Sequence, residues 1–461
     1  MSVAFQNEAR PSAALPLIRG PWGRAIAFRA GQCVGTDAFL ADVLALANDL
    51  PAGLTAVNLC EDRYAFLVAF CALAATGRTN LLPPSRTPQA VAEVLASHPG
   101  AFVLSERAIE PEPPRFFRFA MGAATAVAAD EIPVIAADHI VAIGYTSGST
   151  GTPKANPKSW GGFCASTARN AALLGMTDFE KPIHLLATVP PQHMYGLETS
   201  VLLPLLAACV MDSARPLFPA DVARDLSALP APRTLVTTPV HLRALVQDDT
   251  ILPALDHVIS ATAPLPQELA ILAEERWQAP IVEVFGSTET CVIAHRRTAR
   301  EDAWHLYDGV SLKPQPDGTL VESDSLPAPV LLQDIVELFH PGQFRLCGRS
   351  ADLLEIAGKR ASLGDLTRRL LALRGVEDGV IFQLDADSAG VRRLAALVVA
   401  PQRCELELLG ELRLAVDPAF LPRPLKRVTC LPRNETGKLP RCALLAAVGA
   451  DASALISTDR P

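Results

Sequence analysis

Short apolar runs alternate with longer helical patterns over about the first 260 residues of this chain. Thr55–Cys60 and Thr79–Leu82 have the length of buried strands, and the stretch Tyr64–Ala75 between them has the length and composition of a helix. Such alternation predicts βαβ units, in which parallel strands are covered by helices. Further strand-like runs lie at 140–145, 184–189, 234–238, 257–260 and 281–285. We therefore expect an α/β fold with a large N-terminal domain of mostly parallel sheets layered with helices.

The pattern changes after Cys347, where a short charged stretch is followed by a mixture of helical and strand-like segments. The predicted elements are a helix at 363–374 and strands at 379–384 and 394–400. They indicate a small α+β domain that follows a hinge. We expect an N-terminal acyl- and ATP-binding domain at 1–348 and a mobile C-terminal lid domain at 349–461.

The composition excludes several classes of protein. The chain has 461 residues, of which 49% are apolar and 20% charged, so it can form a large core and does not have the composition of a disordered protein. Acidic residues outnumber basic ones by 49 to 41, which argues against nucleic acid as a partner. None of the ten cysteines forms a C-x-x-C pair, which excludes a metal or redox site of that spacing. Isolated cysteines beside apolar residues suit a reducing compartment better than a secreted disulfide scaffold. No apolar run approaches the roughly 20 residues of a membrane helix, and the N-terminus lacks a signal-peptide pattern, so we expect a cytoplasmic protein with no membrane span.

The strongest local signal is the sequence YTSGSTGTPK at 145–154, which directly follows a strand-like run. Glycine lets a backbone approach an anion closely, while N–H groups and hydroxyls donate to its oxygens and a lysine supplies charge. The Walker A pattern does not match, because Pro153 precedes the lysine. A Ser/Gly-rich linker is the alternative, but the preceding strand and the lysine favour a phosphate-binding loop. Its predicted contacts are Thr146, Ser147, Gly148, Ser149, Thr150, Gly151 and Lys154.

Six segments in order resemble motifs of the adenylate-forming superfamily, which contains acyl-CoA synthetases, nonribosomal adenylation domains and beetle luciferases. They are the phosphate loop, PPQHMYGL at 190–197, SATAPL at 260–265, FGSTE at 285–289, Asp334 with Arg349 fifteen positions later, and PRNETGKLPR at 432–441. Six ordered matches are far harder to obtain by chance than one. The resemblance implies an acid–thiol ligase that converts a carboxylic acid to acyl-AMP with release of pyrophosphate. The acyl group then passes to the pantetheine thiol of CoA or of an acyl carrier protein.

The resemblance also implies a role for each matched residue. Lys438 is expected to be the catalytic lysine of the C-terminal domain, and His193 is expected at the acyl pocket. Thr288 is expected to contact the α-phosphate, and Glu289 to bind Mg²⁺, which prefers oxygen ligands. The other expected contacts to ATP are Ala261 and Ala263 in the segment that flanks the adenine, Phe285 and Gly286 of the FGSTE motif, and Asp334 and Arg349 near the ribose.

The sequence departs from the family pattern at several points. Only 45 residues separate Glu289 from Asp334, which predicts a trimmed β-subdomain with a small hairpin. Asp334 follows Leu-Gln instead of the usual Thr-Gly, and the hinge has Glu355 where the family has lysine. The residues expected at the acyl pocket mix aromatic, small and polar groups, which would accept an aryl or a medium acyl chain. The short chain is similar to the AMP-ligases of bacterial aryl-polyene pigment clusters, which implies an aromatic acid such as a hydroxybenzoate.

Two other functions use the same motifs. A nucleotide-binding sensor or interaction subunit that has lost its chemistry predicts decay of Lys154, Glu289 and Lys438, and all three are present. A luciferase-like oxygenase would use the adenylate as an intermediate, but nothing in the sequence indicates oxygen chemistry. Single residues have structural alternatives as well, since an isolated lysine is usually a solvated surface residue.

Overall fold

The chain divides into two compact units, which we describe separately. Unit 1 comprises residues 1–310 and 322–330, and unit 2 comprises 311–321 and 331–461. The computed structural model describes residues 13–121, 131–146, 153–316, 318–349, 353–356, 359–385, 393–434 and 437–449. The domain boundary at 348/349 stays a prediction, because these units group the strands that precede residue 349 with the C-terminal segment.

Unit 1 contains a six-stranded sheet that is mainly parallel. Its strands, in spatial order, are β10 (Lys154–Ser159), β9 (Ile140–Thr146), β5 (Thr79–Leu82), β4 (Thr55–Asn58), β6 (Phe102–Ser105) and β7 (Phe116–Arg118). Only β10 runs antiparallel, against β9. A separate antiparallel pair joins β1 (Ala14–Pro16) to β8 (Val134–Ala136).

A second, larger sheet of unit 1 has a parallel centre. Its strands, in spatial order, are β17 (Trp304–Leu306), β16 (Cys291–Arg296), β15 (Ile281–Ser287), β14 (His257–Ser260), β13 (Arg233–Thr237), β11 (Ile183–Ala187), β12 (Cys209–Asp212), β2 (Ala25–Arg29) and β3 (Gln32–Gly35). The strands from β15 to β2 are parallel, and β16, β17 and β3 are antiparallel additions. The carboxyl ends of β13, β14 and β15 therefore lie side by side.

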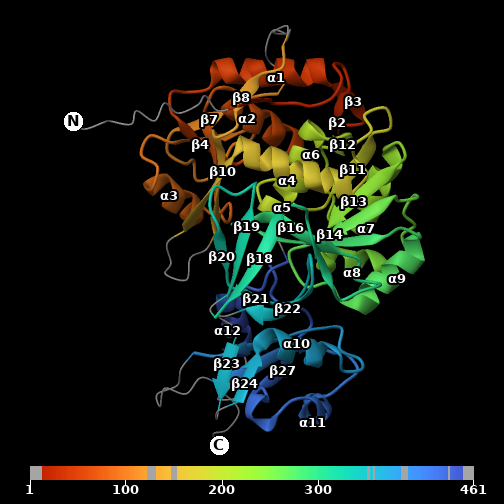
Figure 1. Cartoon of the computed structure of the whole chain (residues 1–461). Coiled ribbons are helices and arrows are strands. Elements are labelled where there is room, and N and C mark those ends of the chain that lie inside the picture. Colours follow the sequence, from red (N-terminus) through yellow and green to blue (C-terminus); the bar gives the residue numbers. More distant parts are fainter. Residues whose placement is uncertain are drawn as a thin grey trace, which may run out of the picture. The chain divides into compact units, whose positions relative to one another are not determined.

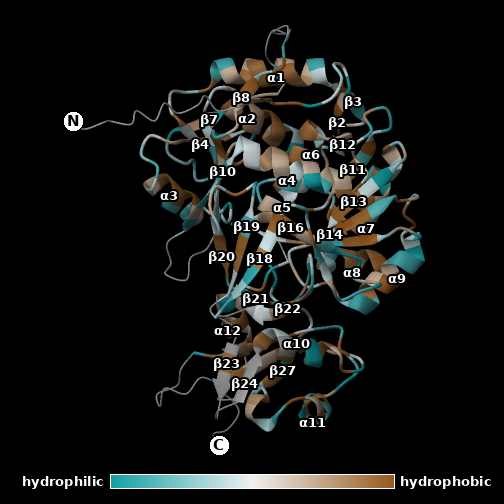
Figure 2. Ribbon diagram, in the orientation of Figure 1, coloured by the Kyte–Doolittle hydropathy of each residue, from teal (hydrophilic) through white to brown (hydrophobic). Residues whose placement is uncertain are grey.

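Helices cover these sheets. Those of unit 1 are α1 (Thr36–Asp49), α2 (Arg63–Ala75), α3 (Pro88–Ala96), α4 (Trp160–Leu173), α5 (Met194–Leu197), the π-helical turn η1 (Glu198–Leu202), α6 (Leu203–Leu206), α7 (Pro219–Ala228), α8 (Pro239–Gln247) and α9 (Gln267–Trp277). α2 is apolar on all sides and is buried along almost its whole length, as such a helix must be. α1 packs beside it and carries both polar and apolar residues, and α8 and α9 lie side by side (Figures 1 and 2).

A small three-stranded sheet contains the points where the chain passes between the units. It has the order β18 (Val310–Gln315), β19 (Gly318–Ser323) and β20 (Val330–Leu332). These strands lie in the segment for which the sequence predicts a trimmed β-subdomain.

Unit 2 has its own hydrophobic core. Its remaining elements are β21 (Asp334–His340), β22 (Gln343–Arg349), β23 (Leu353–Ile356), β24 (Lys359–Ser362), α10 (Leu363–Leu371), β25 (Asp378–Gln383), β26 (Leu394–Val399), α11 (Glu405–Ala415), the 3₁₀ turn η3 (Pro418–Phe420), β27 (Leu425–Arg427) and α12 (Arg441–Gly449). Leu370, Val398, Leu408 and Leu412 lie in the core, so α10 and α11 share it with β26. The helices of the described residues are all too short or too polar to cross a membrane. The α/β class expected from the sequence is confirmed.

Candidate active site

Two strand ends in unit 1, one from each large sheet, bring several predicted residues together. β9 ends at Thr146, and β15 ends just before Thr288 and Glu289. Thr146 Oγ1 donates to Glu289 Oε1 at 3.4 Å. A Cβ atom on Gly144 would lie 2.7 Å from Cγ2 of Thr288, so glycine is required at this position of β9. The first end of the predicted phosphate loop, at Thr146, thus meets the predicted metal-binding turn.

The residues of the phosphate loop that the structure describes are its two ends. Thr146 and Lys154 are directly opposite each other in the antiparallel pairing of β9 with β10. Lys154 is exposed at the start of β10. Ser147, Gly148, Ser149, Thr150 and Gly151 lie outside the described residues, so their predicted contacts stay predictions.

The turn at 287–291 is tight and well hydrogen-bonded. Ser287 Oγ accepts hydrogen bonds from the backbone N–H groups of Glu289 and Thr290, both at 3.2 Å. A Cβ atom on Gly286 would lie 2.2 Å from the carbonyl oxygen of Cys291, which explains the glycine of the FGSTE motif. Cys291 has φ of 63°, an uncommon value for a residue other than glycine. The turn therefore presents the half-buried side chains of Thr288 and Glu289 in a fixed conformation.

The acyl-pocket motif follows β11 and leads into α5. His193 is half-buried and is the N-terminal cap residue of α5. A Cβ atom on Gly196 would lie 2.0 Å from the carbonyl oxygen of Pro190, so the chain doubles back on itself at this point. The Tyr195 hydroxyl lies 3.0 Å from the carbonyl oxygens of both Thr237 and Ile259. Burial raises the pKa of Tyr195, which keeps this donor protonated. The motif is thereby fixed to the carboxyl ends of β13 and β14.

Arg63, the first residue of α2, supports the same motif and was not predicted from the sequence. Its side chain is fully buried, and Nη2 donates to the carbonyl oxygens of Ala187 at 2.8 Å and Val189 at 2.7 Å. Nη1 donates to Ser200 Oγ, beyond α5. Burial lowers the pKa of Arg63 to about 9. An arginine that starts an otherwise apolar helix was the signal available in the sequence.

The segment predicted to flank the adenine is held by a buried carboxylate. Ala261 is buried and Ala263 half-buried, and between them Thr262 has φ of 80°. Glu283 Oε1 accepts from the backbone N–H of Leu265 at 3.0 Å. Its Oε2 accepts from Arg296 Nε at 2.7 Å, in an ion pair that is almost fully buried.

Aromatic packing continues from this ion pair to Phe285. The Arg296 guanidinium lies 4.4 Å from the ring centroid of Trp304, and that ring lies 5.4 Å from the ring of Phe285. A cation over a tryptophan face is favourable. Phe285 is therefore fixed beside the turn that carries Thr288.

In unit 2, the hairpin β21–β22 explains the fifteen-residue spacing between Asp334 and Arg349. These two residues are direct partners in its antiparallel register. Asp334 is half-buried, and its carbonyl oxygen accepts from Thr319 Oγ1 at 2.6 Å. The register places Asp334 and Arg349 at one end of the hairpin, whereas their contacts to a nucleotide stay predictions.

Lys438 is exposed in unit 2, on a loop with its own anchors. Asn434 accepts the Lys438 N–H through Oδ1 at 2.9 Å, and its own N–H donates to the Lys438 carbonyl at 2.8 Å. Arg433 donates to the carbonyl of Gly437 at 2.9 Å and pairs with Asp378 at 2.9 Å. Gly437 has φ of 77°, which favours glycine there. These hydrogen bonds fix the backbone of Lys438 and of its described neighbours on the N-terminal side.

The described residues contain no group of three or more His, Cys, Asp or Glu side chains that could hold a metal ion. Mg²⁺ needs no such group, since it usually binds through one or two carboxylates together with substrate phosphates. Within the described part of the chain, the Glu289 carboxylate has one hydrogen bond, the long one from Thr146. A lone carboxylate beside a predicted phosphate loop fits a metal that arrives with a nucleotide.

Comparisons with known proteins match this chain to AMP-binding enzymes and CoA ligases. The sequence model of the family described as AMP-binding enzyme matches residues 41–319. The chain is 30% identical over 301 residues to a 4-coumarate–CoA ligase of Rhodobacter capsulatus, with 64% of this chain and 74% of that protein covered. It is 29% identical over 310 residues to a 4-coumarate–CoA ligase of Halorhodospira halophila, with 64% and 73% covered.

Solved structures have the same fold at low sequence identity. An O-succinylbenzoate coenzyme A synthetase from Bacillus subtilis, in complex with ATP and magnesium ion, matches with a TM-score of 0.78 at 17% identity, over 91% of this chain and 96% of that chain. ATP-bound MatB from Rhodopseudomonas palustris matches with a TM-score of 0.75 at 18% identity, over 94% and 97%.

Proposed function

Because this chain belongs to the AMP-binding enzyme family, we propose that it activates an aromatic carboxylic acid as acyl-AMP and transfers the acyl group to a pantetheine thiol. The resemblance to the adenylate-forming superfamily is confirmed, and adenylate-forming acid–CoA ligase activity is supported for the family. The observation that carries the proposal is the meeting of Thr146 with Glu289 at 3.4 Å, where the phosphate-loop strand reaches the FGSTE turn.

The first step is attack by a carboxylate oxygen on the α-phosphorus of ATP. The bond between the α-phosphorus and the bridging oxygen breaks, and pyrophosphate leaves. Negative charge accumulates on the phosphoryl oxygens, so preplaced donors lower the barrier. Lys154 and the loop at 146–152 hold the β- and γ-phosphates, and Thr288 donates to the α-phosphate. Glu289 would hold Mg²⁺ together with the phosphates, and the metal would supply positive charge near the departing pyrophosphate.

Lys438 supplies a mobile cation in this proposal. Its ammonium group bridges the substrate carboxylate and an α-phosphate oxygen, which reduces the repulsion between two anions and aligns them for attack. His193 orients the acyl group, while Asp334 and Arg349 bind the ribose. In the second step a thiolate attacks the acyl carbon, and AMP leaves with the electron pair of the broken carbon–oxygen bond.

The substrate class rests on the relatives and on two aromatic residues of the candidate site. Both 4-coumarate–CoA ligases are named for an aromatic acid, and the similarity covers more than 70% of each of them. Tyr195 and Phe285 bring aromatic surface to the strand ends at which the acid binds in this proposal. A hydroxybenzoate or a hydroxycinnamate is the acid that we would test first.

ATP–pyrophosphate exchange across a panel of carboxylic acids tests this proposal. We expect exchange with one or more aromatic acids and little with aliphatic ones. Mass spectrometry with CoA, and separately with a holo-acyl carrier protein, then identifies the thioester acceptor. Absence of exchange with every acid would favour the non-catalytic sensor, and exchange confined to aliphatic acids would overturn the substrate class.

A further inference from the structure

Two buried side chains of opposite charge reach the FGSTE turn from different elements. Lys158 in β10 has a relative exposure of 6%, and its Nζ donates to the carbonyl oxygen of Glu289 at 2.5 Å. Glu198 in η1 has a relative exposure of 1%, and its two carboxylate oxygens lie 3.1 and 3.2 Å from the backbone N–H of Val292. One residue therefore holds the turn at Glu289 and the other holds its exit into β16.

Such burial is costly unless the charges are compensated. Desolvation disfavours a buried ammonium or carboxylate even after the protein relaxes. Glu198 also accepts from Ser166 Oγ in α4 at 2.6 Å. Burial raises the pKa of Glu198, and its hydrogen bonds and the positive charge of Lys158 oppose that rise. Both charged side chains hydrogen-bond to backbone groups at the turn, Lys158 to the carbonyl of Glu289 and Glu198 to the N–H of Val292.

We infer that Lys158 and Glu198 are positioning residues, which hold the Glu289 carboxylate where it meets the metal–nucleotide complex. The inference rests on the proposed function, because it takes Glu289 to be the metal ligand. Groups that orient a metal ligand commonly matter about 10–100-fold for metal affinity. A merely structural role would instead make metal affinity follow overall stability.

The site also connects the metal ligand to the acyl motif. Glu198 lies five positions after His193, directly behind α5, and its partner Ser166 comes from α4. The Cys291 sulfur, at the end of the turn, lies 4.0 Å from the sulfur of Met194 in α5. The acyl motif and the Glu289 turn therefore share supports.

The test uses the full chain and a nucleotide that cannot transfer its adenylyl group to an acid. Calorimetry measures the affinity for α,β-methylene ATP in the presence of Mg²⁺ and in the presence of EDTA. The ratio of the two affinities is the Mg²⁺-dependent gain, and it is measured without a carboxylic acid substrate. Lys158→Met removes the ammonium group at similar length, and Glu198→Gln keeps an acceptor for Val292. We expect each to reduce the Mg²⁺-dependent gain about tenfold, with Mg²⁺-free binding within about twofold.

The double variant Lys158→Met/Glu198→Gln separates positioning from stability. It leaves no uncompensated buried charge, so its melting temperature should recover toward that of the wild type, whereas its Mg²⁺-dependent gain should stay low. Lys426→Met is the matched control, because Lys426 Nζ also donates to a backbone carbonyl, that of Val448 at 2.6 Å, but in unit 2. It should lower neither measure of nucleotide binding.

An unchanged Mg²⁺-dependent gain in folded Glu198→Gln and in the double variant would overturn the inference. Recovery of that gain together with the melting temperature would also overturn it, since the pair would then be only structural. A wild type without any gain from Mg²⁺ would do the same. In each case, pyrophosphate exchange by the wild type reports separately on the proposed function.

Discussion

Two loops carry the charged residues with the largest proposed roles, and they are anchored in different ways. The turn with Glu289 in unit 1 is held by Lys158 and Glu198, which have relative exposures of 6% and 1%. The loop with Lys438 in unit 2 is held by Arg433 and Asp378, whose side chains keep 19% and 14% of their exposure. Lys158 and Glu198 are thus almost completely shielded from solvent, whereas Arg433 and Asp378 remain in contact with it.

The difference follows from what each loop must do. A metal ligand acts through its position, and desolvated charges fix a backbone firmly because leaving either one unpaired is costly. A lysine that has to reach a substrate needs a hydrated charge on a side chain that can move, with only its backbone fixed. Solvent screens the Arg433–Asp378 pair, so its loss should be tolerated better.

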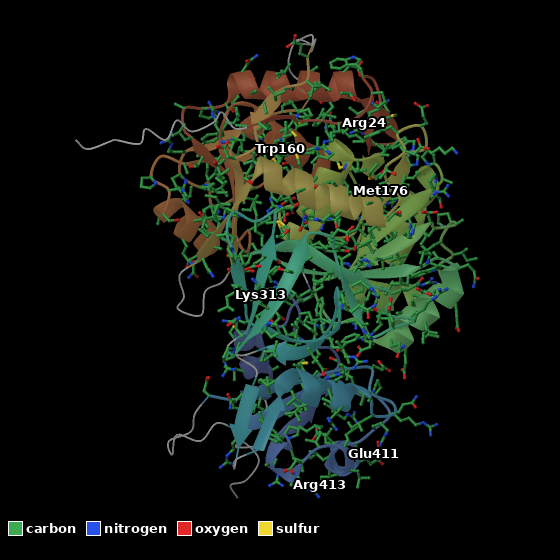
Figure 3. The ribbon with its side chains drawn as sticks, in the orientation of Figure 1. Arg24, Trp160, Met176, Lys313, Glu411 and Arg413 are labelled. Carbon is green, nitrogen blue, oxygen red and sulfur yellow. The ribbon has the colours of Figure 1, made fainter. Side chains whose placement is uncertain are left out.

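The largest effect is expected from Lys438→Ala. Removing a charge that stabilises the transition state should lower the rate of adenylation about 10³-fold. Thioester formation from supplied acyl-adenylate should be largely retained, because the bridge between carboxylate and α-phosphate is no longer needed. Single-turnover assays of both half-reactions measure this, with Arg413→Ala on the surface of α11 as the control (Figure 3). An equal loss in both half-reactions would contradict the role of Lys438.

Glu289→Gln should produce the next largest effect, which is on the Mg²⁺ requirement of the reaction. The amide keeps the size of the side chain but loses the charge, so the Mg²⁺ concentration at half-maximal exchange should rise about tenfold. Lys438→Ala should leave that concentration nearly unchanged in whatever activity it retains. Glu275→Gln on the exposed side of α9 is the control. A metal titration that matches the wild type would remove Glu289 as a ligand.

Several strands of the two large sheets were predictable from local sequence. Thr79–Leu82 and His257–Ser260 were predicted with the bounds of β5 and β14, whereas the predicted ends of other strands, such as 184–189 for β11, differ from the observed ones. The FGSTE turn and the phosphate loop were identified as parts of one site from local motifs, and the structure brings Thr146 and Glu289 together.

The anchors of the site could not be predicted from local sequence. β10, with the sequence KANPKS, has too few apolar residues to indicate a strand, and its burial pattern depends on contacts made far away in the sequence. Lys158 lies 131 positions from Glu289, and Glu198 lies 94 positions from Val292. A charged residue becomes buried only when the fold supplies partners at such distances, and no periodicity in the chain encodes those partners.

Asp378→Asn weakens the more exposed anchor and should have a smaller effect. The pair is partly solvated, so we expect a loss of about 1 kcal/mol or less in the free energy of unfolding of unit 2. Adenylation should fall only about threefold, since both hydrogen bonds between Asn434 and the Lys438 backbone remain. Chemical denaturation and pyrophosphate exchange measure the two quantities. A loss as large as that of Lys438→Ala would show that the Lys438 loop is as sensitive to its anchor as the Glu289 turn.

The smallest expected effect is on the pH dependence of the free energy of unfolding. Its sign tests whether desolvation or the charge of Lys158 dominates at Glu198. Burial raises the pKa of Glu198 above its ordinary value of 4.5, against opposing hydrogen bonds from Ser166 and Val292 and the charge of Lys158. A carboxyl group with a higher pKa in the folded state binds more protons there, so its contribution to stability is full below the unfolded pKa and declines as pH rises through the folded pKa. Glu198→Gln cannot titrate. The free energy of unfolding of this variant, minus that of the wild type, should therefore increase with pH from the unfolded pKa upward, whereas a decrease would mean that Lys158 outweighs desolvation and that the pair is stabilised chiefly by its charges.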